Sequence, residues 1–236
     1  MAIDGASKVN EDMIKRIFDL VTATTLVLLA SPILLAVAIA VRVKLGGPVL
    51  YRQQRPGLGG QPFMLMKFRS MLPPGVSTGD VVADEMLRLT PFGHWLRNSS
   101  LDELPSLLNV IRGEMSLVGP RPLLMKYLPL YSRDQMRRHD VRPGLTGWAQ
   151  VNGRSALSWQ RKFELDLWYV DHRSFWLDLR ILVLTAIKVV RREGVTPDSS
   201  ALMPNFTGAE TDYRDRNELS SPRSPSVQTN ECKELP

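Results

Sequence analysis

The longest apolar stretch of the chain runs from Leu20 to Val41, LVTATTLVLLASPILLAVAIAV, and contains no charged residue. At about 1.5 Å rise per residue, such a helix is long enough to cross a hydrocarbon core of about 30 Å. The stretch is too long for the apolar region of a signal peptide, and no convincing small-residue cleavage site accompanies it. The pattern therefore predicts a membrane helix, preceded by a polar leader over residues 1–12.

Two arrangements of this helix are open: one spanning helix, or a re-entrant helix-break-helix over residues 13–45 that enters and leaves on one face. Ser31 and Pro32 lie at the centre of the run. Proline removes a backbone hydrogen bond and bends a helix, and the serine hydroxyl can bond to the freed groups. Basic pairs flank the run at positions 15–16 and 42–44, and the positive-inside rule assigns both ends to the cytoplasm. Both features favour the re-entrant form, although kinked spanning helices are common.

Beyond the membrane segment, the pattern predicts one catalytic domain over residues 46–200. Strands are expected at 49–51 and 62–69, joined by a Pro/Gly turn at 55–60, which together make a small β-hairpin. Helices are expected over 89–98, 104–112 and 124–139, the last interrupted by Pro129. Residues 201–236 are polar and predict a disordered tail. The fold class is therefore α+β and mainly helical.

Two further segments mix large apolar, aromatic and basic residues, at 123–131 and 175–192. Neither is long enough to span a bilayer. Each is compatible with an amphipathic helix in the membrane interface, its cations facing the headgroups, or with packing in a soluble core. The neighbouring membrane segment shifts the balance toward interfacial helices on a monotopic membrane protein.

Charge narrows the class of partner. The 236 residues carry 30 Lys and Arg against 24 Asp and Glu, a formal net charge of +6. This balance indicates an anionic partner, which can be a phospholipid surface, a nucleic acid or a phosphorylated substrate. The single cysteine, Cys232, excludes disulfides and thiolate metal sites within the chain.

The segment from Ser100 to Pro122 holds the clearest candidate chemistry. Asp102 and Glu103 are adjacent carboxylates between Arg97 and Arg121. Carboxylates can hold a divalent cation or attack phosphorus, while arginines neutralise phosphate oxygens, so the segment is a candidate for phosphoryl transfer. The spacing of these residues is equally compatible with a purely structural role.

That alternative is a helix cap. Ser100 and Glu103 fit the S-x-x-E capping box, and Asp102 is an alternative cap that would place Pro105 in the first turn. Either cap places the acids at a helix N-terminus, which favours anions.

Other motifs are less specific. RPGLTGWAQVNGR, from Arg142 to Arg154, can offer amides and guanidinium groups to phosphate, although an ordinary loop is the better interpretation of this run alone. The three histidines lack metal-ligand spacing. The chain has neither a P-loop nor a G-x-G-x-x-G motif, so a nucleotide would not be held by those folds.

Four motifs occur in one order: KRIFDL with LLASPILLAVAIAV, YRQQRPGLGGQPFMLMKFRSM, RNSSLDELPSLLNVIRGEMSLVGPRPLL and HDVRPGLTGWAQVNGRSALSW. Together they cover roughly residues 13–194, and on them the chain resembles the small, monotopic members of the bacterial sugar transferase family, which are polyprenyl-phosphate phosphoglycosyl transferases. The resemblance implies a re-entrant break at Ser31-Pro32 and an active site on the cytoplasmic face of the bacterial inner membrane. It also implies transfer of a sugar 1-phosphate from a UDP-sugar to undecaprenyl phosphate, with release of UMP.

The resemblance assigns roles to particular residues. Asp102 matches the family nucleophile, which forms a covalent aspartyl intermediate in ping-pong kinetics, and it also shares a Mg²⁺ ion with the diphosphate. Glu103 is implied to be a second catalytic residue that assists by positioning or deprotonating the acceptor, or by contributing to the metal site. The implied phosphate- or nucleotide-binding positions are Lys67, Arg97, Arg121 and Arg154, with Pro120 shaping a turn near the uridine.

Two other functions compete: a membrane-anchored nucleic-acid binder and a non-catalytic anchored scaffold. Against the first, aromatic residues do not alternate with the basic runs as stacking platforms do, so no nucleic-acid partner is expected. For the donor, an N-acetylated amino sugar such as diacetylbacillosamine is the best match to the small family members. A homo-oligomer is compatible with everything in the sequence.

Overall fold

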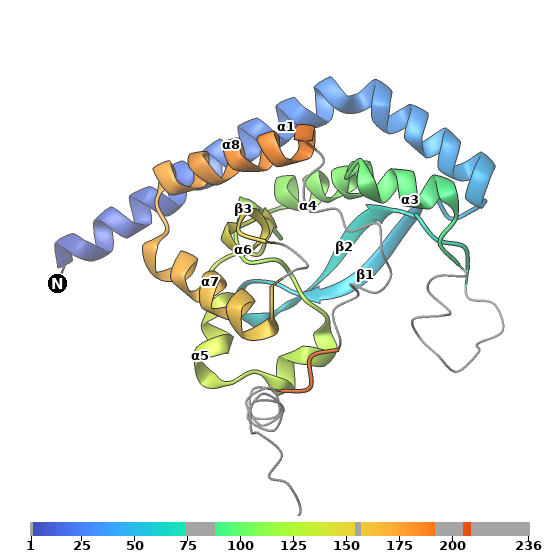
Figure 1. The fold of residues 1–236 in the computed structure, drawn as a ribbon. Coiled ribbons are helices and arrows are strands. Elements are labelled where there is room, and N and C mark those ends of the chain that lie inside the picture. The colour runs from blue at the N-terminus through green and yellow to red at the C-terminus, as the bar shows by residue number, and fades with distance from the viewer. Residues whose placement is uncertain (1, 74–87, 154–156, 192–204, 209–236) are drawn as a thin grey trace, which may run out of the picture.

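The structure is a computed structural model that describes residues 2–73, 88–153, 157–191 and 205–208, with side chains described from residue 11 onward. A small mixed α/β centre lies beneath two long helices, α1 and α8, which run along one edge of the domain (Figure 1). The α-helices of the described residues are α1 Ala2–Leu45, α3 Pro91–Asn98, α4 Leu107–Arg112, α5 Arg133–Met136, α6 Trp148–Val151, α7 Trp159–His172 and α8 Phe175–Arg191. The strands are β1 Leu50–Pro56, β2 Pro62–Phe68, β3 Ser116–Val118 and β4 Gly144–Thr146, and the 3₁₀ helices are η1 Leu58–Gly60, η2 Leu101–Ser106, η3 Met125–Leu130 and η4 Arg137–His139.

Helix α1 is the predicted membrane helix, and it also takes in most of the expected polar leader because it begins at Ala2. It has Pro32 inside it and bends near its midpoint (Figure 1). The Ser31 hydroxyl donates a hydrogen bond to the Leu28 carbonyl at 2.8 Å, one turn back. The helix is continuous here, so the chain changes direction at Ser31-Pro32 by bending and not by an interruption of the helix.

Both flanks of the apolar run of α1 are attached to the same domain. Near its start, Lys15 forms an ion pair with Asp178 of α8, and Arg16 donates to the Val110 and Ile111 carbonyls of α4 at 2.7 and 2.9 Å. Just past its end, the Gly47 carbonyl accepts a hydrogen bond from Arg69 at 2.7 Å. The apolar middle of α1 is therefore bracketed by two anchors on one body.

That apolar middle is exposed. The most hydrophobic window of α1 has a mean hydropathy of 2.5, and only 11% of it is buried against the rest of the protein. A core helix of a soluble protein would be mostly buried. Within the described part of the chain, α1 is the one helix long and apolar enough to cross a membrane.

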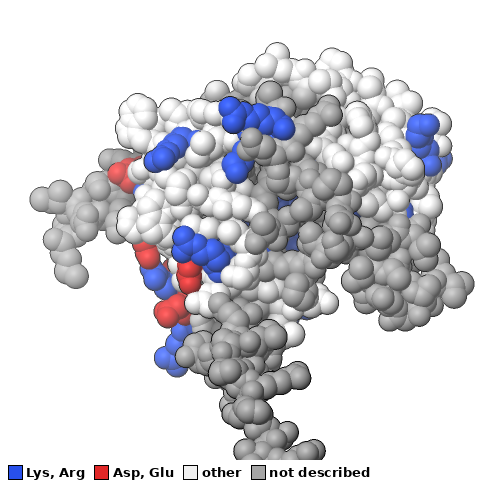
Figure 2. Space-filling view, viewed as in Figure 1, with Lys and Arg blue, Asp and Glu red and all other residues white. Residues whose placement is uncertain are grey.

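Helix α8 continues the apolar surface. Its outer face exposes Trp176, Leu179, Val183 and Ile187, which recur at helical spacing, while Ile181 faces the core. The topmost edge of the molecule, where α1 runs, shows no charged side chains in Figure 2, and basic side chains lie just below it over α8. The interfacial interpretation of residues 175–192 agrees with this exposed face. Segment 123–131 is different, because Tyr127 and its apolar neighbours pack in an aromatic core cluster.

The predicted β-hairpin is confirmed. Strands β1 and β2 pair antiparallel from Leu50 opposite Phe68 to Pro56 opposite Pro62. The intervening turn contains Gly59 and Gly60 with φ of 60° and 74°, a region that suits glycine. Lys67 alternates in step with the buried Phe63 and Leu65, so it lies on their face of β2, where its ammonium group reaches Glu103 of η2.

A second sheet was not predicted. Strands β3 and β4 are three residues each and pair in parallel, with Ser116 opposite Gly144 and Val118 opposite Thr146. The backbones beyond them are in close contact: a Cβ at Gly147 would lie 2.1 Å from the Gly119 carbonyl oxygen. Only glycine permits this approach. The pairing places the GPRP and RPGLTG motifs side by side.

Three expectations need correction. The helix expected over 104–112 is split, because Pro105 lies inside the 3₁₀ helix η2 and the α-helix begins only at Leu107. The segment 124–139 is a succession of short turns, η3, α5 and η4, and not one interrupted helix. The tail is not wholly disordered, because Phe206 is only 4% exposed and belongs to the aromatic cluster.

Candidate active site

The acid pair lies in η2, and neither carboxylate caps a helix. Ser100 has a left-handed backbone with φ of 57° and its side chain makes no cap hydrogen bond. The capping-box interpretation is therefore wrong, and so is the alternative with Asp102 as the cap, since Asp102 is already inside the 3₁₀ helix. The two side chains are free for other interactions.

Glu103 binds two cations at once. Its Oε1 accepts hydrogen bonds from Lys67 Nζ and from an Arg121 terminal nitrogen, both at 2.6 Å. Burial by itself would raise the pKa of Glu103, but Arg121 and Lys67 outweigh it and hold that pKa well below its usual range. Glu103 is thus an ionised anchor that joins β2 to the GPRP loop.

Two buried side chains fix β2 against η2 and α4. Asn109 accepts a hydrogen bond from the Met66 amide at 3.1 Å and donates one to the Met64 carbonyl at 2.8 Å. The Ser106 hydroxyl donates to the Met66 carbonyl at 2.7 Å. These bonds fix the strand immediately before Lys67, and so help to hold its ammonium group opposite Glu103.

Asp102 is the other half of the pair and is only 8% exposed. Among the described residues, its carboxylate has no hydrogen-bonding or ion-pair partner. Burial, and next the negative charge of Glu103, raise the pKa of Asp102 from 3.8 to about 6, against the opposing charges of Lys67, Arg121 and Arg97. The site therefore holds an unpaired carboxylate within the field of three cations.

Arg97 reaches this field from the last turn of α3. Its Nε donates to the Ser70 hydroxyl at 2.9 Å, which fixes the side chain next to the end of β2. Five of the predicted residues are thus brought together: Lys67, Arg97, Asp102, Glu103 and Arg121. Arg154 lies outside the described residues.

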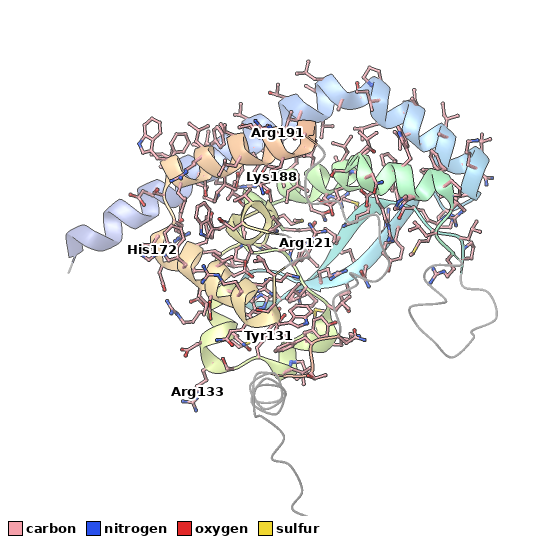
Figure 3. The ribbon with its side chains drawn as sticks, in the orientation of Figure 1. Arg121, Tyr131, Arg133, His172, Lys188 and Arg191 are labelled. Atoms are coloured by element: carbon pink, nitrogen blue, oxygen red, sulfur yellow. The ribbon has the colours of Figure 1, made fainter. Side chains whose placement is uncertain are left out.

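Pro120 shapes the loop that carries Arg121. It is buried, its carbonyl accepts a hydrogen bond from the Gly144 amide at 3.0 Å, and the Gly119 amide donates to the Thr146 carbonyl at 2.9 Å. Arg121 lies at the middle of the domain between α8 and Tyr131 (Figure 3). The β3–β4 pairing therefore sets the position of the GPRP loop.

Sequence reasoning missed the support beneath this loop. Arg138 donates to the Arg121 carbonyl at 2.8 Å and forms a buried ion pair with Asp166 at 2.6 Å. Arg138 sits in the basic run RRH of η4, which alone looks like an ordinary charged surface. Its burial depends on α7, a later helix, so nothing local distinguished it.

Arg55 was missed as well. It is the penultimate residue of β1, just before the Pro/Gly turn, and donates to the Pro122 carbonyl at 3.3 Å. Burial, and next the nearby Arg121, lower the pKa of Arg55. Lys162 of α7 also has a pKa lowered by burial and then by Arg121. The site therefore contains more basic side chains than the four that the motifs indicated.

A divalent cation fits this donor set only in part. Within the described chain no group of three or more His, Cys, Asp or Glu side chains gathers as a metal site. Glu103 already has its Oε1 bound to two cations, whereas the Asp102 carboxylate is uncommitted. Mg²⁺ commonly binds through one or two carboxylates plus substrate phosphates, and Asp102 suits that arrangement.

The chain was compared with known proteins. It is 54% identical over 197 residues to the uncharacterized sugar transferase EpsL of Bacillus subtilis, covering 84% of this chain and 97% of that protein. It is 44% and 41% identical to UDP-glucose:undecaprenyl-phosphate glucose-1-phosphate transferases of Xanthomonas campestris and Escherichia coli, over 67% and 75% of this chain. The match spans 35% and 40% of the length of those two enzymes. The sequence profile of the bacterial sugar transferases matches residues 10–192, which include the whole acid-pair site, and the chain therefore belongs to the bacterial sugar transferase family.

Proposed function

We propose that this protein transfers a sugar 1-phosphate from a UDP-sugar to undecaprenyl phosphate and releases UMP, through a covalent intermediate on Asp102. The observation that carries the proposal is the uncommitted, buried Asp102 carboxylate within the field of Lys67, Arg97 and Arg121. Relatives named as UDP-glucose:undecaprenyl-phosphate glucose-1-phosphate transferases support the class of donor and acceptor.

The chemistry is two displacements at one phosphorus. In the first, an Asp102 oxygen attacks the β-phosphorus, the bond from that phosphorus to the bridging oxygen breaks, and UMP departs with the bonding electrons. In the second, an oxygen of undecaprenyl phosphate attacks the same phosphorus and Asp102 leaves as a free carboxylate. Each bond formed matches a bond broken, and the scheme predicts ping-pong kinetics.

The surrounding cations act on charge. Lys67, Arg97 and Arg121 lie where they neutralise the diphosphate oxygens, so that an anionic nucleophile can approach. Glu103 remains ionised because Arg121 and Lys67 hold its pKa down, and a carboxylate of that kind is a poor proton acceptor. We therefore assign Glu103 to orienting Lys67 and Arg121 rather than to deprotonating the acceptor.

Mg²⁺ belongs to this proposal through Asp102. When bound there with substrate phosphates, the ion would supply charge neutralisation for the departing UMP. The contribution of the described residues is a buried Asp102 carboxylate that none of them engages in a hydrogen bond or ion pair.

The membrane arrangement follows from α1. The two flanks of its apolar run are held by one domain, at Lys15 and at Gly47, while the run itself is exposed. A straight spanning helix would place these flanks on opposite faces of the bilayer. We propose that α1 is re-entrant, with both ends and the active site on the cytoplasmic face of the bacterial inner membrane, and with α8 in the interface.

The test is release of UMP by the purified protein, with undecaprenyl phosphate, Mg²⁺ and a set of UDP-sugars that includes UDP-glucose and UDP-N-acetylated amino sugars. Omission of the acceptor should leave one sugar phosphate on Asp102, which intact-protein mass spectrometry detects and which an Asp102→Asn variant should lack. Turnover by purified Asp102→Asn protein would exclude the covalent route. Salt-dependent nucleic-acid binding without UMP release would instead favour the nucleic-acid alternative, and neither activity would favour a scaffold.

A further inference from the structure

Residues 205–208 lie beyond the region that the family profile matches, which ends at residue 192, yet they pack on the domain. Phe206 is inserted among four aromatic rings of η3, α7 and the adjoining loop. The distances between ring centroids are 5.8 Å to Tyr127, 5.9 Å to Tyr131, 5.4 Å to Trp159 and 5.2 Å to Phe163. These four ring contacts form a binding site for the segment on the surface of the domain.

A polar contact supports the same docking. The Asn205 side-chain oxygen accepts hydrogen bonds from Lys126 Nζ and from the Tyr127 hydroxyl, both at 2.9 Å. Lys126 also lies over the Tyr127 ring, 5.2 Å from its centroid. Asn205 and Phe206 thus fix the segment to η3 through two different kinds of contact.

The aromatic cluster in turn holds Arg138. The guanidinium carbon of Arg138 lies 5.7 Å from the Tyr131 ring centroid and 5.5 Å from that of Phe163. Its NH1 donates to the Tyr131 hydroxyl at 3.2 Å. Two of the rings that contact Phe206 therefore also pack against the Arg138 guanidinium group.

Arg138 connects these two rings to the active site. The same guanidinium that stacks on Tyr131 and Phe163 donates to the Arg121 carbonyl at 2.8 Å. Arg121 then reaches Glu103 at 2.6 Å. A continuous series of contacts runs from Phe206 through Arg138 to Arg121, one of the two cations that bind Glu103, and Figure 3 shows Tyr131 below Arg121 in that view.

We propose that residues 205–208 form a C-terminal clasp that positions Arg121 for the donor diphosphate by holding Arg138 against the aromatic cluster. The proposal rests on the proposed function, in which Arg121 binds the donor. Phe206 and Asn205 are positioning residues, because they touch neither Asp102 nor the diphosphate site. Removing the clasp would open one side of the aromatic cluster and admit water to the Arg138 guanidinium group. The hydrogen bond from Arg138 to the Arg121 carbonyl would then weaken.

The test uses two truncations of the full chain, one ending at Gly208 and one ending at Pro204. Both remove the tail, and only the second removes the clasp. The probe is UDP, whose affinity for the purified protein is measured by calorimetry. We expect the chain ending at Gly208 to match the full chain, and the chain ending at Pro204 to bind UDP about tenfold more weakly, which corresponds to about 1.4 kcal/mol. Equal UDP affinity for the two truncations overturns the proposal.

Point variants separate positioning from general stability. Asn205→Asp keeps an acceptor for Lys126 and Tyr127, whereas Asn205→Ala removes it, so the first should retain UDP affinity and the second should weaken it. Phe206→Leu keeps most of the apolar volume and should retain UDP affinity, whereas Phe206→Ala does not keep it and should weaken UDP binding. These four variants decide the matter if the chain ending at Pro204 does not fold. Loss of thermal stability with unchanged UDP affinity across all of them would show a structural role alone.

An Arg121→Gln background tests the route. If the clasp acts through Arg121, the truncation at Pro204 should cause no further loss of UDP affinity once Arg121 is replaced. An undiminished additional loss contradicts the route. Failure of the proposed function is distinguishable, because in that case the full chain itself would neither bind UDP nor release UMP from UDP-sugars.

Discussion

Replacing Asp102 by Asn should remove transfer activity and at the same time stabilise the fold. The carboxylate is buried, beside the ionised Glu103, and unpaired among the described residues, so its charge is costly in the free protein. Its pKa is raised from 3.8 to about 6, a shift of about two units. At about 1.36 kcal/mol per unit, the ionised form costs on the order of 3 kcal/mol.

The sign determines the pH dependence. A carboxyl group whose folded pKa is raised binds protons more readily when folded, so the wild-type protein loses this stability as the pH rises from about 4 to about 6. An asparagine has no such dependence. The stability difference in favour of Asp102→Asn should therefore be near zero at pH 4 and reach its full size above pH 7.

Thermal unfolding in one detergent, with EDTA to exclude divalent cations, measures the difference. For a chain of this size about 3 kcal/mol corresponds to roughly 6–12 °C in Tm. Asp134→Asn, at an exposed position on α5, is the matched control and should change Tm little at any pH. An Asp102→Asn protein that is equal to or less stable than the wild type at pH 8 would refute the argument that this carboxylate is strained in the free state.

Three other predictions address the site, its support and the membrane helix. The activity of the wild type should rise as the pH passes through about 6, where Asp102 ionises. Glu103→Gln should move that limb of the pH–rate profile to lower pH, because a like charge is removed; an unmoved limb contradicts this. Asn109→Leu should cost about 2–4 kcal/mol in denaturant unfolding, because it removes the hydrogen-bond partner of the buried Met66 amide and of the partly buried Met64 carbonyl; a loss below 1 kcal/mol contradicts it. Cysteines introduced as Glu11→Cys and Lys44→Cys, in a Cys232→Ser background, should both react with an impermeant thiol reagent from the cytoplasmic side; labelling from opposite sides would establish a spanning helix.

Much of the fold was readable from local pattern. The apolar run of α1, the proline at its centre and the hairpin with its Gly turn are properties of short segments, and short segments determine helices and turns directly. The site residues Lys67, Asp102, Glu103 and Arg121 were identified through motifs. Their mutual geometry was not identified, because Glu103 looked like half of a capping box, whereas in the structure it joins strand β2 to the distant GPRP loop.

The second sheet and the clasp could not be read locally. Strands β3 and β4 are three residues each, and their pairing depends on glycines that allow close approach of loops far apart in the sequence. Phe206 lies in a polar tail whose composition indicates disorder, and only the cluster made by η3 and α7 gives it a place to be buried. The average composition of the tail indicates disorder, but the single residue Phe206 determines where this part of it docks.

The sequence by itself determined the membrane helix, the mainly helical α+β class, the family and the identity of the acid pair with its cations. Those properties depend on runs of apolar residues and on motifs that are local. Only the tertiary structure decided that Glu103 binds Lys67 and Arg121 and that Asp102 has no partner among the described residues. It also decided that Arg138 supports Arg121 from beneath. The physical reason is that burial and charge pairing, which set these roles and the raised pKa of Asp102, are produced by elements that meet only when the chain is folded.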